Sequence, residues 1–266
     1  MKLAFHKYVG AGNDFLFLSD DPNLSNTQKK QIAIELCDRH WGVGADGIAF
    51  FKKLSSSENR FEWDFWNSDG SHAEMCGNAA RCSMVYFKKL YDADRSELLT
   101  KAGLVSGGPS DEPLTAFVQW DLSETSLEGK DVELRGGLSI SGFFIDTGVP
   151  HFVVPGRGDQ LSHSQLLEIQ EHDEFRPRQT NVTLLDTIDG KHHSKSFERG
   201  VQDITLACGT GLVASACVLQ AQTGERSFDL RAPGGDLCVS LLDNNRIELK
   251  GPAVPVFQGE FEVKNV

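Results

Sequence analysis

Alternating apolar and polar positions predict several short β-strands along this chain. In residues 61–65 the aromatic side chains Phe61, Trp63 and Phe65 alternate with acidic ones, which places the aromatic rings on one face of a strand. Further strands are predicted where apolar runs are bounded by Gly, Pro or Asp, at residues 140–145, 152–154, 181–185 and 237–242. The pattern therefore indicates an α/β (α+β) fold class with many short strands.

Helical signals are fewer, and the clearest of them begins with a capping box. Ser25 followed by Gln28 is a Ser-x-x-Gln pattern, which predicts a helix that ends near Arg39. Three further helices are predicted: one following Gly77 toward Leu90, one from Ser162 to Gln170, and one following Gly209 toward Thr223. The chain is thus expected to carry few helices among many strands.

Residues 106–113, with the sequence SGGPSDEP, form the stretch that is most typical of a linker. A boundary there predicts an N-terminal domain of residues 1–110 carrying Cys76 and a C-terminal domain of residues 111–251 carrying Cys208. We expect the C-terminal residues, from about 252 to 266, to return to the N-terminal domain.

The two halves of the sequence also resemble each other. Residues 12–15 have a counterpart in residues 148–151, and Cys76-Gly77-Asn78 has one in Cys208-Gly209-Thr210, at offsets of 136 and 132 residues. The shared order and spacing favour an internal duplication. A duplication predicts two similar domains related by a pseudo-two-fold axis, with equivalent loops meeting at a cleft.

Charge and composition narrow the class of protein. The chain has 26 Lys and Arg against 38 Asp and Glu, a net charge of −12, which argues against nucleic acid and anionic membranes as partners. No apolar run reaches the roughly 18 residues that a membrane span requires, and no secretory signal is evident. We therefore expect a cytoplasmic protein whose six cysteines are reduced.

Two of these cysteines, Cys76 and Cys208, are each followed by glycine and a run of small, helix-compatible residues. Such a context places a sulfur at a helix N-terminus, where the helix dipole and free N–H groups lower a thiol pKa and also bind carboxylates. A thiolate and a thiol suit stereoinversion at an amino-acid α-carbon, because one removes the α-proton and the other protonates the opposite face. We interpret the remaining cysteines as structural: Cys37, Cys82, Cys217 and Cys238. No metal-ligand spacing appears, and no metal or cofactor is predicted.

Taken together, the motifs resemble the diaminopimelate epimerase family over essentially the whole chain. The matching segments include residues 10–15, 38–47, 67–71, 76–78, 150–151, 180–182, 198–200, 208–211, 233–237 and 251–253. The resemblance implies two similar α/β domains, each a strand-rich barrel-like shell around a central helix, with the active site at their interface. It also implies a cofactor-independent isomerase that converts LL-2,6-diaminopimelate to meso-diaminopimelate in lysine and peptidoglycan biosynthesis, and a homodimer.

The resemblance further implies a role for each matching residue. Cys76 and Cys208 would be the acid/base pair. Four residues at the two helix starts would hold the reacting carboxylate: Gly77, Asn78, Gly209 and Thr210. His151 and Glu198, counted with the catalytic residues, would engage the reacting amino group. The substrate pocket would be lined by Asn13, Asn67, Asn181 and Arg199, with Arg199 pairing the distal carboxylate.

One departure from the family pattern bears on the substrate. Val149 stands where the family typically has Asn before Pro-His, which removes a polar contact to the distal end of the substrate. A racemase of another amino acid, for example histidine, is therefore the alternative on the same scaffold. From a different class comes a non-catalytic binding or redox-sensing protein that keeps two reactive thiols. The sequence leaves open which cysteine is the thiolate.

Overall fold

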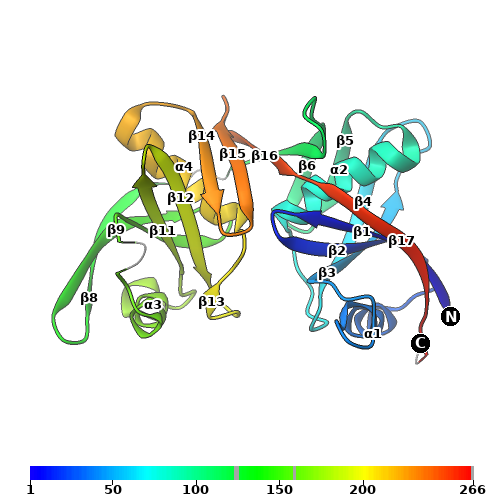
Figure 1. The fold of residues 1–266 in the computed structure, drawn as a ribbon, viewed down its shortest axis with the longest axis horizontal. Coiled ribbons are helices and arrows are strands. Elements are labelled where there is room, and N and C mark those ends of the chain that lie inside the picture. Colours follow the sequence, from blue (N-terminus) through cyan, green and yellow to red (C-terminus); the bar gives the residue numbers. More distant parts are fainter. Residues whose placement is uncertain (123–125, 158–159, 265–266) are drawn as a thin grey trace. The chain divides into compact units, whose positions relative to one another are not determined.

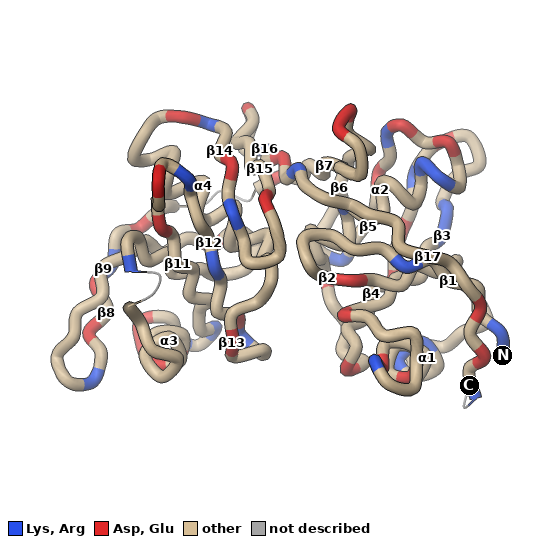
Figure 2. The backbone as a smooth tube through the Cα atoms, in the orientation of Figure 1, with Lys and Arg blue, Asp and Glu red and all other residues tan. Residues whose placement is uncertain are grey.

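The computed structural model describes residues 1–122, 126–157 and 160–264. The chain forms two compact units, Met1–Trp120 with Lys250–Val266 and Asp121–Leu249 (Figure 1). Both units are rich in strands and hold few helices, so the fold class expected from the sequence is confirmed. Figure 2 shows basic and acidic residues interspersed along both units, without a continuous basic stretch.

The first unit winds strands around one central helix. Its strands are β1 (Lys2–Gly10), β2 (Asn13–Ser19), β3 (Gly47–Lys53), β4 (Arg60–Asn67), β5 (Ser96–Thr100), β6 (Gly103–Pro109), β7 (Thr115–Asp121) and β17 (Val254–Glu262). Its helices are α1 (Asn26–Cys37) and α2 (Gly77–Tyr91). β1, β2, β5, β6 and β17 all pack against α2. Because strands surround it, α2 buries residues on every face over its first three turns.

The second unit repeats this plan. Its strands are β8 (Glu128–Leu134), β9 (Leu138–Asp146), β10 (Pro150–Pro155), β11 (Asn181–Ile188), β12 (Lys191–Glu198), β13 (Asp203–Ile204), β14 (Ser227–Ala232), β15 (Gly235–Leu241) and β16 (Arg246–Pro252), which runs past the end of the unit. Its helices are α3 (His163–Gln170), the short 3₁₀ helix η1 (Asp173–Phe175) and α4 (Gly209–Thr223). β9–β12, β14 and β15 pack against α4, which is the central helix of this unit.

The pairing order of the strands is the same in both units. β2 pairs with β3 in parallel and β3 with β4 antiparallel, and β10, β11 and β12 repeat these two pairings. The next strand after the central helix pairs in parallel with β4 in the first unit and with β12 in the second. This shared topology confirms the expectation of two similar domains, which the match of residues 12–15 with 148–151 and the two cysteine motifs had indicated.

The predicted elements lie where the local signals placed them. The capping box of Ser25 and Gln28 opens α1, and a second capping box opens α3 at Ser162. α2 and α4 begin at Gly77 and Gly209, as expected. The rings of Phe61, Trp63 and Phe65 are all buried on one face of β4, and the other predicted strands are present as well.

The linker interpretation of residues 106–113 is wrong. Residues 106–109 are the end of β6, which pairs with both β5 and β7. A Cβ added at Gly107 would lie 2.3 Å from the carbonyl oxygen of Phe117, and one at Gly108 would lie 2.2 Å from that of Asp94. The glycines are therefore required by close backbone approach inside the first unit, and flexibility is not their role.

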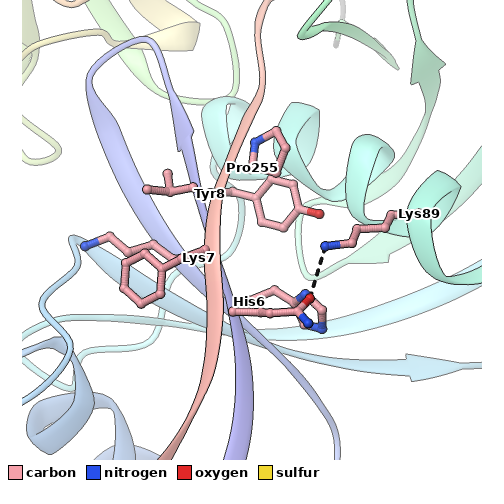
Figure 3. A pocket seen from close by; sticks show the side chains of 8 residues that line it. His6, Lys7, Tyr8, Lys89 and Pro255 are labelled. Atoms are coloured by element: carbon pink, nitrogen blue, oxygen red, sulfur yellow. Dashed lines mark hydrogen bonds between the residues drawn. The ribbon is translucent and has the colours of Figure 1, made fainter.

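A pocket of about 250 Å³ lies where β1, β17 and α2 meet (Figure 3). Its walls include His6, Tyr8 and Phe257, and Lys89 Nζ donates a hydrogen bond to Gln258 Oε1 at 3.1 Å. Lys89 lies twelve residues after the first residue of α2, which corresponds to about 18 Å along the helix axis. The pocket is thus at the opposite end of α2 from Cys76.

Candidate active site

Cys76 and Cys208 occupy equivalent backbone positions. Each is the N-cap residue of the central helix in its unit, with extended backbone angles (φ −141° and ψ 113° for Cys76, φ −105° and ψ 107° for Cys208). Each carbonyl accepts the first intrahelical hydrogen bond, from Ala80 N at 2.9 Å and from Leu212 N at 3.0 Å. Both side chains are partly exposed. The prediction that both sulfurs lie at helix N-termini is confirmed.

The surroundings of Cys208 keep its thiol protonated. Cys208 Sγ lies 3.4 Å from Thr210 Oγ1, and the side chains of Glu198 and Ser196 also hydrogen-bond to it. Burial, together with the charge of Glu198, raises the pKa of Cys208 to about 12. The expectation of a lowered thiol pKa is therefore wrong for Cys208. Desolvation and the carboxylate of Glu198 both raise the pKa, and together they outweigh the lowering by the N–H groups at the helix start.

Glu198 is itself in an unusual state. It ends β12 and accepts a hydrogen bond from Thr205 Oγ1. Burial raises the pKa of this carboxyl group above its ordinary value. A carboxyl group that holds its proton more tightly than usual, next to a thiol, is typical of acid/base sites.

His151 is fully buried, and both of its ring nitrogens are hydrogen-bonded. Nδ1 lies 2.9 Å from Thr183 Oγ1 and Nε2 lies 2.9 Å from Thr210 Oγ1. Burial, assisted by the charge of Arg199, lowers the pKa of His151 to about 3, so the ring is neutral at physiological pH. Since Thr210 also contacts Cys208, one hydroxyl group connects the imidazole to the thiol.

Three residues of this cluster were not predicted: Thr183, Ser196 and Gly211. Thr183 Oγ1 and Ser196 Oγ are 3.0 Å apart, behind the imidazole of His151. A Cβ at Gly211 would lie 2.1 Å from Ser196 Oγ, so only glycine fits there. The Cys-Gly-Thr-Gly pattern and the placement of Ser196 two residues before Glu198, on the same face of β12, were the signals available in the sequence.

Asn181 and Arg199 lie together where β11 begins and the antiparallel β12 ends, in the second unit. Asn181 faces His151 in the parallel pair of β10 and β11, and its Oδ1 accepts a hydrogen bond from Arg199 N at 2.9 Å. Arg199 Nη1 donates to the carbonyl oxygen of Arg178 at 2.5 Å, while Arg178 Nη1 donates to Asp146 Oδ2 at 2.6 Å. The sequence did not indicate Arg178. The strand ends therefore bring two arginines next to Asn181.

The first unit holds its predicted residues at the corresponding strand ends. Asn13 begins β2 directly after a turn in which Ala11 and Gly12 have positive φ angles of 52° and 86°. Asn78 Nδ2 donates to Asn13 Oδ1 at 2.7 Å, and Asn13 Nδ2 donates to Asp46 Oδ2 at 2.9 Å. These side chains form one hydrogen-bonded chain that begins at the start of α2.

Asn67 occupies the end of β4, opposite the first residue of β3. Its Nδ2 donates to Ser71 Oγ at 2.9 Å. Asn67 therefore lies at the same end of the strands as Asn13, but it is outside the hydrogen-bonded series of Asn78, Asn13 and Asp46.

Within residues 1–122, 126–157 and 160–264, no group of three metal-ligating side chains is close enough to hold a metal ion. In the same part of the chain, no helix combines the length and apolar character needed to cross a membrane.

The fold and the two N-cap cysteines define a class of protein: a two-unit, strand-rich chain with a thiol at the start of each central helix. The sequence profile described as diaminopimelate epimerase matches residues 5–112 and 143–256. A diaminopimelate epimerase from Hydrogenobaculum sp. (strain Y04AAS1) is 32% identical, over 95% of this chain and 96% of the relative. This chain belongs to the diaminopimelate epimerase family.

Solved structures show the same fold at low sequence identity. A PhzC/PhzF-type phenazine biosynthesis protein from Clostridium difficile aligns with a TM-score of 0.73 at 12% identity, covering 98% of this chain and all (100%) of that chain. A hydroxyproline epimerase from Agrobacterium vitis, with bound trans-4-hydroxy-L-proline, aligns with a TM-score of 0.72 at 12% identity, covering 97% and 92% of the two chains. These likenesses establish the architecture.

Proposed function

We propose that this chain converts LL-2,6-diaminopimelate to meso-diaminopimelate, as a cofactor-independent isomerase in lysine and peptidoglycan biosynthesis. The observation that carries the proposal is the repeated N-cap cysteine, present once in each unit of a chain that belongs to the diaminopimelate epimerase family. Two thiols at equivalent backbone positions, each at the start of a central helix, supply one proton acceptor and one proton donor, which inversion at a carbon requires.

In this mechanism one cysteine acts on each face of the α-carbon. A thiolate removes the α-proton, and the other cysteine delivers its thiol proton to the opposite face, so that the thiol and thiolate exchange identities. The N–H groups at the starts of α2 and α4, from Gly77, Asn78, Gly209 and Thr210, bind the α-carboxylate and stabilise the charge that develops on it. Glu198 and the neutral His151 orient the reacting amino group.

The distal end of the substrate carries a second carboxylate. We assign its recognition to Arg199, supported by Asn181, Asn13 and Asn67. The Arg199 guanidinium donates to the carbonyl oxygen of Arg178, and within the described parts of the chain its Nε has no hydrogen-bond partner, which leaves a donor for a ligand. A guanidinium with donors left unused is suited to bidentate carboxylate binding.

The test is proton exchange at the α-carbon. Incubating the reduced protein with LL-diaminopimelate in D₂O should introduce one deuterium at the inverted α-position, measured by NMR and mass spectrometry, with meso-diaminopimelate as the product. Arg199→Lys is the matched variant, because it keeps the charge and loses the bidentate geometry. It should raise the KM while retaining exchange. Unlabelled substrate after prolonged incubation would refute this specificity.

Val149 supports a second candidate, racemisation of another amino acid such as histidine. Its side chain is partly exposed in the turn that leads into β10, directly before Pro150 and His151. An apolar side chain at that position favours a shorter or less polar distal group than a second amino-acid head. Loss of optical activity with single amino acids, at rates above that with diaminopimelate, would favour this candidate.

We also propose a cytoplasmic homodimer. Support for self-association comes from Val256 and Phe257, neighbouring apolar residues of β17 that are 51% and 49% exposed. Light scattering of the purified protein measures the assembly, and Phe257→Glu should shift it toward the monomer.

A further inference from the structure

Arg81 is a buried cation one helical turn beyond Cys76. It lies in α2, five residues after the cysteine, and its side chain is 0% exposed. Nη2 donates to Asn78 Oδ1 at 2.8 Å and Nη1 lies 3.4 Å from the carbonyl oxygen of Gly77, while the buried Nε has no hydrogen-bond partner among the described residues. Side chains in a helix lean toward its N-terminus, so the guanidinium points back toward the start of α2.

This guanidinium has no carboxylate partner within ion-pair distance among the residues that the structure describes. Among the described residues, the ionisable groups that act electrostatically on Arg81 include the thiols of Cys82 and Cys76. Burying a cation without an anion is costly, and buried charges in proteins are normally paired. Burial lowers the pKa of Arg81 to about 10, and the group therefore remains charged at neutral pH.

The other ionisable groups near α2 are engaged or remote. Cys82 is fully buried, and burial raises its pKa to about 12, so it stays a thiol. Tyr8 of β1 is buried with its pKa raised to about 12, and Asp14 of β2 is paired with Lys7 and Arg39. The remaining charged or titratable groups on the strands that pack against α2, or just before the helix, are the exposed Lys2 and the partly buried His6 of β1, the exposed Glu97 of β5, the exposed Glu260 and Glu262 of β17, and the exposed Glu74.

The second unit lacks this cation. Val213 holds the position in α4 that Arg81 holds in α2, five residues after the cysteine, and it is buried. The charged group next to Cys208 is a carboxyl group, Glu198. The duplicated helix starts thus differ in the sign of the charge beside the sulfur: a cation in the first unit and an acid in the second.

We propose that Arg81 is the buried counter-charge of Cys76 and fixes Cys76, and not Cys208, as the thiolate of the resting protein. Cys76 loses its proton to solvent, and the resulting anion completes the pair that the guanidinium otherwise lacks. Cys208 keeps its proton beside Glu198. Arg81 is a positioning residue that acts through the charge of Cys76, without contact to substrate.

The assignment rests on the proposed function and adds a direction to it. In the resting state the Cys76 thiolate takes the α-proton and the Cys208 thiol supplies the new one. The protein leaves this turnover with a Cys76 thiol and a Cys208 thiolate. Before the next turnover in the same direction a proton passes from Cys76 to Cys208 through solvent, which restores the resting state.

Alkylation by iodoacetamide without substrate tests the proposal, because only a thiolate reacts. Rates at Cys76 and Cys208 are followed separately by peptide mass spectrometry between pH 5 and pH 10, in the native protein, Arg81→Met and Arg81→Lys. The Cys76 midpoint should lie at least about one pH unit below that of Cys208. Arg81→Met should raise it by about one unit or more, a roughly tenfold slower reaction at pH 7, whereas Arg81→Lys should largely restore it. Cys208 is the internal control.

An unchanged Cys76 profile in Arg81→Met would overturn the proposal, as would a Cys208 that reacts at lower pH than Cys76 in the native protein. If Arg81→Met only raises the KM for substrate, the guanidinium serves the substrate carboxylate and the proposal is also wrong. Alkylation of the buried Cys37 and Cys82 reports unfolding of a variant, in which case the native comparison and Arg81→Lys decide. The alkylation assay contains no substrate, so failure of diaminopimelate turnover in the kinetic assay is a separate result that refutes only the proposed function.

Discussion

The starts of α2 and α4 share a backbone geometry and differ in the charged residue near each cysteine. Cys76 is followed one turn later by the buried cation Arg81, while Cys208 lies against Glu198, Thr210 and Ser196. A two-base reaction needs chemically similar groups in opposite protonation states. The shared backbone geometry agrees with two related halves, and the different neighbours of the two sulfurs are the basis on which we propose opposite protonation states for Cys76 and Cys208.

Replacing either cysteine should have the largest effect on activity. Cys76→Ala and Cys208→Ala should each lower epimerisation by about 10³-fold or more, because each direction of inversion uses both groups. Cys238→Ala is the matched control, since Cys238 is a partly exposed cysteine of β15 outside both helix starts, and it should retain full activity. A single alanine variant with native turnover would favour a binding or redox-sensing role instead.

Lowering the pH should destabilise the second unit, because this unit contains the buried His151. Its pKa falls from 6.5 to about 3 on burial, so the unfolded chain binds a proton that the folded unit rejects. The free energy of unfolding therefore decreases as the pH falls from about 6.5 toward 3, by on the order of 2–4 kcal/mol from this group. Chemical denaturation at several pH values measures it.

The variant that isolates this effect is His151→Gln, which cannot take up a proton and should flatten the pH dependence. His192→Gln removes a partly exposed histidine of β12 that hydrogen-bonds Thr187, and should leave the dependence intact. Equal slopes in both variants would contradict the role assigned to His151.

The smallest expected effects come from substitutions at the third residue after each cysteine. This residue is Gly211 in α4 and Ala79 in α2. Gly211→Ala places a methyl group against Ser196 Oγ and should cost about 1–3 kcal/mol of stability while displacing the hydroxyl groups around His151. Ala79→Gly should cost about 1–2 kcal/mol, because it lowers helix propensity and removes one buried methyl group. Thermal unfolding and activity together would show whether only the first change disturbs catalysis, as expected.

Local signals in the sequence were sufficient for much of the fold. The capping boxes, the small residues after Cys76 and Cys208, and the alternation in β4 depend on neighbours along the chain, and the structure places those elements as predicted. Gly107 and Gly108 were misinterpreted because the backbone that approaches them belongs to Phe117 and Asp94. A pattern of glycine and proline does not distinguish close packing from a flexible linker.

The same limit applies to the site. The sequence placed Cys208 at a helix start, but its raised pKa depends on burial and on Glu198, ten residues earlier on another element. Arg81 was visible within the cysteine motif, yet its burial follows from the strands that surround α2. Thr183 and Ser196 come from two strands whose pairing brings their hydroxyl groups together. Each of these depends on tertiary packing, which a motif does not contain.

The return of the chain to its beginning has a consequence for biosynthesis. β17 pairs with β1 along its whole length, and Met1 and Val263 exchange backbone hydrogen bonds of 2.9 and 2.8 Å. The second unit is a continuous segment and has all of its residues once Leu249 has left the ribosome, whereas the first unit then still lacks β17, which pairs with β1. The half that is translated first is therefore the last to close, and during that interval β1 exposes an unpaired edge that other chains can join.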